Sequence, residues 1–220
     1  MCIRDSYRLI PNSFHFENLS LFNTSYRGLH MKNNTYENDV RILGGKFKGK
    51  LLPVLDVEGL RPTPSRVRET IFSWIKDSLG NAKVLDLFAG SGALGLEAYS
   101  RGAKDVTLVE LDKDNSSNLK EIAKSMSYDE IHVINDDALH FLDNVSSTFN
   151  IVFIDPPYKL DIYEKVLEKL LDKNLIDDDS LIYVEMRNGS NKIVPGYEII
   201  REENAGQSKY SLWTKSKLLF

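Results

Sequence analysis

Apolar runs and amphipathic segments alternate along most of this chain, and this alternation restricts the fold more than any other feature. Strand-like runs occupy residues 83–88, 105–111, 131–135, 150–155 and 180–186, with helix-like segments between them. Such alternation is typical of a mostly parallel sheet covered by helices, so it predicts a doubly wound α/β fold. Two more strands, at 196–202 and 209–216, have no helix between them and are expected to pair antiparallel.

Two shorter features precede the expected sheet. Apolar pieces at 40–43 and 50–54 flank a glycine-rich turn, which predicts a small β-hairpin. Residues 64–79 are expected to form a helix, with Thr63 as its N-cap and Pro64 at the first helical position.

The N-terminal part differs from the rest because it has no sustained periodicity. Its first six residues, MCIRDS, resemble translated sequencing adapter, and Met31 stands just before the regular pattern begins. We expect a native start near Met31 and a dispensable segment before it; a natural tail without stable structure is the alternative. The chain is thus divided into an extension at 1–38, a hairpin at 39–60 and a main domain at 61–220.

The composition is that of an ordinary globular protein with a slight acidic excess. The 220 residues carry 28 Lys and Arg against 32 Asp and Glu, a net charge of −4. No apolar run approaches the roughly 18 residues that a transmembrane helix needs. Cys2 is the single cysteine and the four His show no metal-ligand spacing, so we expect no disulfide, no metal site and a cytoplasmic location.

A glycine-rich segment follows the first strand of the expected sheet. Gly90–Gly95 reads G-x-G-x-x-G between a strand and a helix, which lets a ligand approach the backbone at a helix N-terminus. Glu110 ends the next strand, where a carboxylate can accept both hydroxyl protons of a ribose. Together these features predict a ligand that carries a nucleoside, the alternative being a glycine turn without a ligand.

Acidic residues at two strand ends favour S-adenosylmethionine over a dinucleotide. Asp86 stands inside the first strand end, where dinucleotide folds usually have apolar residues. A carboxylate there can approach the ammonium of a methionine moiety. Asp136 and Asp137 follow the third strand, where a side chain can read the amino group of an adenine. Their alternative role is to cap the next helix, and Asp137 can serve both purposes.

The most specific motif is Asp155-Pro156-Pro157-Tyr158, which follows the apolar run 151–154. The prolines fix the backbone and remove two donors, so the carbonyls of Asp155 and Pro156 point rigidly outward. A carboxylate beside a fixed carbonyl suits an exocyclic NH2 group, and Tyr158 offers a flat face for stacking on a base. The alternative is a proline-rich turn with a packed tyrosine, but the motif lies at the sheet edge where α/β proteins bind ligands.

This motif and LDLFAGSGALGLE (85–97) resemble the class I S-adenosylmethionine-dependent N-methyltransferases that modify exocyclic amines. Four further segments resemble the RsmD family, bacterial methyltransferases of guanine N2 in 16S ribosomal RNA: RILGGKFKGKLLP (41–53), GLRPTPSRVRETIFSWI (59–75), SRGAKDVTLVELD (100–112) and NAGQSKYSLW (204–213). The resemblance implies a Rossmann-like class I methyltransferase sheet, mostly parallel, with an antiparallel terminal hairpin. It also implies 16S rRNA as the partner, within a small ribosomal subunit or an assembly intermediate, with no membrane partner and a monomeric chain.

The same resemblance assigns roles to residues of two groups. The Asp155 carboxylate and the Pro156 carbonyl accept hydrogen bonds from the two N–H groups of the target amine. Pro157 and Tyr158 complete the catalytic motif. The reaction it implies is an in-line displacement that depends mostly on positioning. Residues expected to bind the cofactor are Asp86, Phe88, Ala89, Gly90, Ser91, Gly92, Glu110, Leu111, Asp137 and Ala138.

Positive charge is concentrated near the start of the regular pattern. Residues 41–76 contain eight Lys or Arg against three acids, so this stretch carries +5 and the rest of the chain −9. Binding to phosphates needs a local patch rather than a global excess. Arg66 and Arg68 could also form a solvated helix face or pair with Glu69. Residues expected to contact RNA are Arg41, Lys46, Lys48, Lys50, Arg61, Arg66 and Arg68.

Three other functions stay open at this point. The Asp155–Tyr158 motif also suits an amino-methyltransferase that acts on another RNA or on DNA adenine. A non-catalytic RNA-binding assembly factor could keep the fold, although RNA binding requires neither this motif nor the glycine loop. An NAD-dependent oxidoreductase would need a hydride-transfer constellation, and the sequence shows no convincing one.

Overall fold

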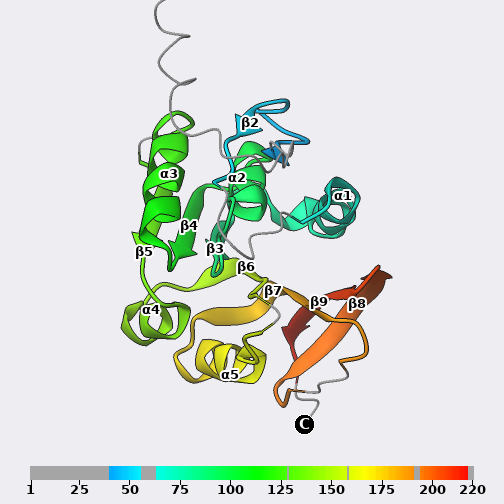
Figure 1. The fold of residues 1–220 in the computed structure, drawn as a ribbon. Helices are drawn as coiled ribbons and strands as arrows, with labels where there is room; N and C mark the ends of the chain where they lie inside the picture. Colours follow the sequence, from blue (N-terminus) through cyan, green and yellow to red (C-terminus); the bar gives the residue numbers. More distant parts are fainter. Residues whose placement is uncertain (1–39, 56–62, 128, 158, 191–193, 218–220) are drawn as a thin grey trace, which may run out of the picture. The chain divides into compact units, whose positions relative to one another are not determined.

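The computed structural model describes residues 40–55, 63–127, 129–157, 159–190 and 194–217 (Figure 1). The predictions for residues 1–38, Arg61 and Tyr158 lie outside this part of the chain. The elements are β1 (Val40–Arg41), β2 (Leu51–Leu52), α1 (Ser65–Trp74), a 3-10 turn (Lys76–Ser78), β3 (Lys83–Asp86), α2 (Ala93–Ser100), β4 (Asp105–Glu110), α3 (Lys113–Lys124), β5 (Ile131–Asn135), α4 (Ala138–Asn144), β6 (Phe149–Ile154), α5 (Tyr163–Asp172), β7 (Ile176–Arg187), β8 (Tyr197–Ala205) and β9 (Ser208–Lys215).

Seven of the strands form one twisted sheet in the order β5-β4-β3-β6-β7-β9-β8. The five strands β3 to β7 are parallel to one another, while β9 runs antiparallel to both β7 and β8. The predicted parallel sheet with an antiparallel terminal hairpin is therefore confirmed. β1 and β2 form a separate antiparallel pair, as the sequence also predicted.

Helices cover both faces of the sheet, and Figure 1 shows α1, α2 and α3 on one side with α4 and α5 on the other. Two apolar clusters correspond to these layers. Phe153 and Tyr183 belong to the cluster with Phe72 of α1, whereas Val152 and Val184 belong to the cluster with Leu167 of α5. Successive strand residues point to opposite faces, so this division tells which side chains of β6 and β7 face α1.

The start of α1 differs from the sequence prediction. Its N-cap position is Pro64, which makes no side-chain cap, so the prediction of Thr63 as the cap is wrong. The Thr63 hydroxyl instead donates a hydrogen bond to Asp155 Oδ2, 3.2 Å away. The helix ends at Trp74, and the 3-10 turn at Lys76–Ser78 replaces the last turn that was expected.

The parallel strands end at one edge of the sheet, and this edge positions the site. Asp86 and Glu110 are the last residues of β3 and β4, Asp155 directly follows β6, and Arg187 is the last residue of β7. Across the described residues, none of the helices has both the length and the apolar character needed to cross a membrane.

Candidate functional site

The glycine loop turns sharply between β3 and α2. Gly90 and Gly92 have φ values of 50° and 73°, a left-handed conformation that glycine adopts without steric cost. Gly92 is the N-cap residue of α2 and makes no side-chain cap. The loop thus leaves backbone rather than side chains at the start of α2, where a ligand can approach closely.

Contacts from β4 and α3 hold this loop in place. The two carboxylate oxygens of Glu110 accept hydrogen bonds from the backbone N–H groups of Gly90 (2.9 Å) and Asp112 (2.8 Å). Asn115 is buried and donates its side-chain amide to the Gly90 carbonyl, 2.6 Å away. Each Glu110 oxygen has a second lone pair, so the carboxylate can still accept a hydroxyl proton.

Asp86 is a buried carboxyl at the end of β3, with 2% of its surface exposed. Its Oδ2 accepts a hydrogen bond from the backbone N–H of Gly95, 2.9 Å away, which ties the strand end to the first turn of α2. Burial raises the pKa of Asp86 to about 7, assisted by the negative charge of Glu110 and opposed by hydrogen bonds from the backbone of Gly95 and Phe88. Folding therefore makes ionisation of this carboxyl costly.

Asp155 lies half-buried just after β6, beside a second carboxylate. Burial raises the pKa of Asp155 well above its usual value. The negative charges of Glu185 and Asp86 raise it further, and the Thr63 hydroxyl opposes the shift. Glu185 is 6% exposed on β7, where its Oε2 accepts a hydrogen bond from the Tyr183 hydroxyl, 2.8 Å away.

We call Asp86, Asp155 and Glu185 the carboxylate cluster. Negative charge gathered in a buried site disfavours a pyrophosphate and favours a cation. S-adenosylmethionine carries an ammonium and a sulfonium, so the residues present fit this cofactor better than a dinucleotide. In the described part of the chain, no group of His, Cys, Asp and Glu is arranged to hold a metal ion.

The other predicted cofactor residues lie near the same edge of the sheet. Leu111 follows Glu110 and is 68% exposed, a large value for an apolar side chain, while Phe88 is half-buried. Asp137 caps α4, because its Oδ1 accepts from the backbone N–H groups of Leu139 (2.9 Å) and His140 (3.1 Å). The capping role proposed for Asp137 is thus confirmed, and a role towards adenine stays a prediction. Ala89, Ser91 and Ala138 are buried around the loop and the start of α4.

The β1–β2 hairpin presents three of the seven predicted RNA-contacting cations to solvent. Arg41, Lys46 and Lys48 are exposed and Lys50 is half-buried. The hairpin is fastened to the end of α2, where Ser100 accepts from the Lys46 N–H through its carbonyl (2.7 Å) and from the Phe47 N–H through its hydroxyl (2.9 Å). A Cβ on Gly45 would lie 1.8 Å from the Ser100 carbonyl oxygen, so this close approach requires glycine.

Two of the predicted RNA-contacting arginines lie in α1, and they have different environments. Arg66 is exposed, whereas Arg68 is only 2% exposed. Arg68 donates to the Arg41 carbonyl (3.0 Å) and lies 3.6 Å from Glu97, an α2 side chain with no exposed surface. The prediction of an RNA contact for Arg68 is therefore wrong, because its guanidinium is buried in a contact between α1, α2 and the hairpin.

We call Arg68, Glu97 and Arg101 the Glu97 cluster. Glu97 Oε1 accepts from Arg101 Nε at 2.6 Å, and its Oε2 accepts from the backbone N–H of Leu43 at 2.7 Å. Burial lowers the pKa of the Arg68 guanidinium, and the negative charge of Glu97 opposes that shift. A single buried acid thus joins α1, the hairpin and the C-terminal end of α2.

Comparison with known proteins assigns the chain to a protein family. A family model described as "Conserved hypothetical protein 95" matches residues 40–214. Ribosomal RNA small subunit methyltransferase D of Escherichia coli K12 is 40% identical over 185 residues, which cover 83% of this chain and 93% of that protein. The chain belongs to the RsmD family.

Solved structures of similar proteins agree with this family membership. Protein yhhF from Escherichia coli is 39% identical and covers 81% of this chain and 98% of its own, with a TM-score of 0.74. HI0767 from Haemophilus influenzae is 35% identical and covers 82% and 100%, with a TM-score of 0.71. The predicted Rossmann-like methyltransferase fold is confirmed, and the predicted cofactor, S-adenosylmethionine, agrees with membership of the RsmD family.

Three residues of the site were not recognised in the sequence. Thr63 was interpreted as a helix cap, while Glu97 and Glu185 were given no role. Both glutamates stand in otherwise apolar segments, ALGLEAYS of α2 and SLIYVEM within β7. A single acid in a segment that must be buried needs a partner or a function. This pattern could have identified Glu97 and Glu185 from the sequence.

Proposed function

We propose that this chain transfers a methyl group from S-adenosylmethionine to the exocyclic N2 of a guanine in small-subunit ribosomal RNA. The observation that carries the proposal is the position of Asp155. Its carboxyl follows β6 at the ligand-binding edge of the sheet, is followed by two prolines, and interacts electrostatically with Asp86. Membership of the RsmD family supports rRNA as the substrate, since relatives in that family are named as rRNA small subunit methyltransferases.

The residues after β6 are suited to orient a weakly nucleophilic amine. The Asp155 carboxylate and the Pro156 carbonyl accept hydrogen bonds from the two N–H groups of the guanine amine. With both N–H groups held in this way, the nitrogen lone pair points away from the two acceptors. Bound S-adenosylmethionine would supply a sulfonium methyl in line with that lone pair, so that the N–C bond forms as the C–S bond breaks. The raised pKa of Asp155 suits it to accept the proton that the methylated nitrogen then releases.

Residues around the glycine loop would hold the cofactor by charge and by apolar contact. The buried Asp86 carboxylate would face the ammonium group, and Glu110 would accept from the ribose hydroxyls. The exposed Leu111 and the half-buried Phe88 offer apolar surface for the adenine, with Asp137 near its amino group.

The RNA would approach over the β1–β2 hairpin and the start of α1. The basic surface consists of the exposed cations Arg41, Lys46, Lys48 and Arg66. Arg68 is buried and does not belong to it. A guanine inside a helix cannot reach Asp155, so the target must lie in a loop or leave its stack.

Methyl transfer followed by nucleoside analysis tests this function. Small subunits from a strain that lacks the modification, separated large subunits and DNA are each incubated with the protein and tritiated S-adenosylmethionine. We expect label in the small-subunit RNA only, recovered as N2-methylguanosine. Recovery of N6-methyladenine, or label in DNA, would establish the alternative amino-methyltransferase, and no transfer to any substrate would leave only an RNA-binding role.

Charge reversal in the hairpin tests the RNA surface. Replacing Lys46, Lys48 and Lys50 by Glu should weaken RNA binding, and the slope of log affinity against log salt should fall by about 0.7–0.9 for each lost phosphate contact. The matched control replaces Lys165 and Lys169 of α5 and its C-cap residue Lys173 by Glu; α5 covers the opposite face of the sheet. Equal RNA affinity in the two triple variants, measured by filter binding, would refute the proposed surface.

A further inference from the structure

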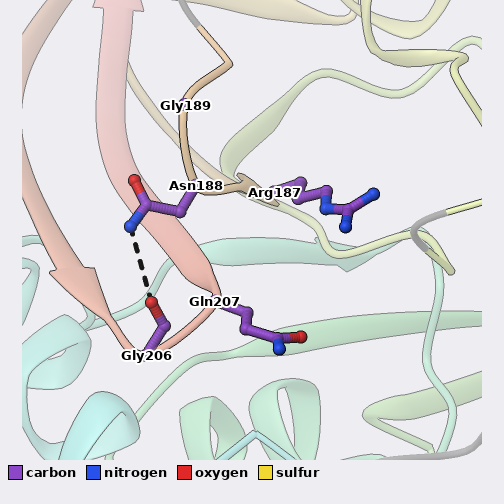
Figure 2. A pocket seen from close by; sticks show the side chains of 5 residues that line it. All are labelled: Arg187, Asn188, Gly189, Gly206 and Gln207. Carbon is purple, nitrogen blue, oxygen red and sulfur yellow. Dashed lines mark hydrogen bonds between the residues drawn. The ribbon is translucent and has the colours of Figure 1, made fainter.

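An open, shallow cavity lies where the end of β7 meets the turn between β8 and β9 (Figure 2). Its volume is about 360 Å³, and it is lined by Arg187, Asn188, Gly189, Gly206 and Gln207. The last two belong to NAGQSKYSLW, a segment that carried part of the family resemblance but has no role in the function proposed above. The pocket is open to solvent, so a nucleotide of a bound RNA could lie against its lining without being enclosed.

The cavity shares an edge and a face of the sheet with Asp155. Ile154 of β6 pairs with Val184 of β7, so Asp155 and Glu185 occupy the next positions on neighbouring strands. Phe153 and Tyr183 pack in the α1-side cluster, and alternation places Asp155, Glu185 and Arg187 on that same face. Arg187 therefore stands two residues, about 7 Å, beyond Glu185 in the direction of the substrate-binding edge.

The lining combines a positive charge with amide groups on a fixed backbone. The Asn188 N–H donates to the Gln207 carbonyl at 2.7 Å, and Asn188 Nδ2 donates to the Gly206 carbonyl at 3.4 Å, which ties the two strand ends together. In Figure 2 the Arg187 and Gln207 side chains extend to the same side of this junction. A guanidinium can bind a phosphate or a guanine edge with two bonds, and a glutamine amide offers both donor and acceptor to a base.

We propose that this cavity binds the nucleotide next to the target guanine in the substrate RNA. Arg187 holds its phosphate or its base edge, and Gln207 hydrogen-bonds to the base. The proposal rests on the proposed function, because it names a second subsite for the same RNA. Unpaired RNA is recognised through base edges that are free of their partners, and a subsite beside Asp155 would add that selectivity to the electrostatic attraction of the hairpin.

Steady-state methyl transfer to small subunits that lack the modification tests this subsite. Arg187→Ala and Gln207→Ala should each lower kcat/KM for the subunits by roughly 5- to 100-fold, with the KM for S-adenosylmethionine unchanged. Arg187→Lys keeps the charge but loses the planar fork, so its activity should lie between wild type and Arg187→Ala. Arg201→Ala, which removes an exposed arginine from β8, is the matched control and should leave kcat/KM unchanged.

The outcomes separate this inference from the proposed function. Wild-type protein that fails to methylate the subunits would overturn the proposed function itself. Wild-type activity with Arg187→Ala and Gln207→Ala both within about twofold of it would overturn the subsite alone. A loss matched by an equal loss of S-adenosylmethionine affinity would also overturn it, because the residues would then act on the fold or the cofactor rather than on the RNA.

Discussion

The Glu97 cluster and the carboxylate cluster both bury acidic side chains, but the described contacts of their acids differ. Glu97 has no exposed surface and faces two arginines and a backbone N–H. At the carboxylate cluster, Asp86 accepts a hydrogen bond from the backbone N–H of Gly95, and Asp155 accepts one from the Thr63 hydroxyl. In the first cluster opposite charges hold the fold together, whereas in the second burial raises the pKa of Asp86 and of Asp155, and the charges of Glu185 and Asp86 raise that of Asp155 further.

This difference separates a structural use of buried charge from a functional one. A protein has no reason of stability to gather like charges at a sheet edge, because ionising them there costs free energy. The raised pKa values of Asp86 and Asp155 at the ligand-binding edge therefore point to a site that a bound cation would stabilise. The Glu97 cluster balances its charge within the protein and serves to place the basic hairpin.

Loss of Asp155 should produce the largest effect. Asp155→Ala removes the acceptor that orients the amine, and we expect methyl transfer to fall by about 10²–10⁴-fold while S-adenosylmethionine binding is largely kept. Single-turnover transfer and calorimetry measure the two properties separately. Asp129→Ala, at an exposed acid before β5, is the control. Near-normal turnover in Asp155→Ala would refute its role.

Neutralising one acid in each cluster should change stability in opposite directions. Glu97→Gln leaves two arginines without their acid, and we expect the free energy of unfolding to fall by about 3–5 kcal/mol. Asp155→Asn removes a charge that is costly when ionised, so it should raise the free energy of unfolding at pH 7.5. Urea denaturation measures both.

Glu121→Gln serves as the control for this pair of variants, since the exposed ion pair of Glu121 with Lys124 on α3 contributes about 1 kcal/mol at most. If Glu97→Gln proved no more destabilising than Glu121→Gln, the Glu97 cluster would not have the structural role assigned to it.

The smallest expected effect concerns the Thr63 hydroxyl. It favours the ionised form of Asp155, so Thr63→Val should raise the pKa of Asp155 and move the acid limb of the pH–rate profile to higher pH. We expect kcat/KM at pH 6 to fall by roughly two- to tenfold, with a smaller loss above pH 8. Thr63→Ser keeps the hydroxyl and should restore the wild-type profile; a Val variant with an unshifted profile would remove Thr63 from the mechanism.

The sequence was sufficient to predict the sheet because its local patterns agree with its tertiary structure. Residues 131–135 and 138–144 form β5 and α4 with the predicted bounds, and the absence of a helix between β8 and β9 revealed their antiparallel pairing. The glycine loop and the residues that end β3, β4 and β6 also lie at one edge, as expected for parallel strands.

Long-range partners of single side chains could not be predicted in this way. Thr63 and Asp155 are 92 positions apart, and Leu43 and Glu97 are 54 apart, so no local pattern relates them. Arg68 shows the consequence: among cations counted by sequence it resembles a surface residue, and only the packing of α1 against α2 reveals that it is buried.

Proton release on cofactor binding tests most directly the claim that the carboxylate cluster awaits a cation. Burial raises the pKa of the Asp86 carboxyl to about 7, and a bound ammonium should lower that pKa and expel the proton of the protonated form. Calorimetric titration of S-adenosylmethionine at pH 7 in phosphate and in Tris measures this exchange. We predict net proton release, with affinity rising as the pH rises through 7; equal binding enthalpies in the two buffers, or proton uptake, would contradict the account.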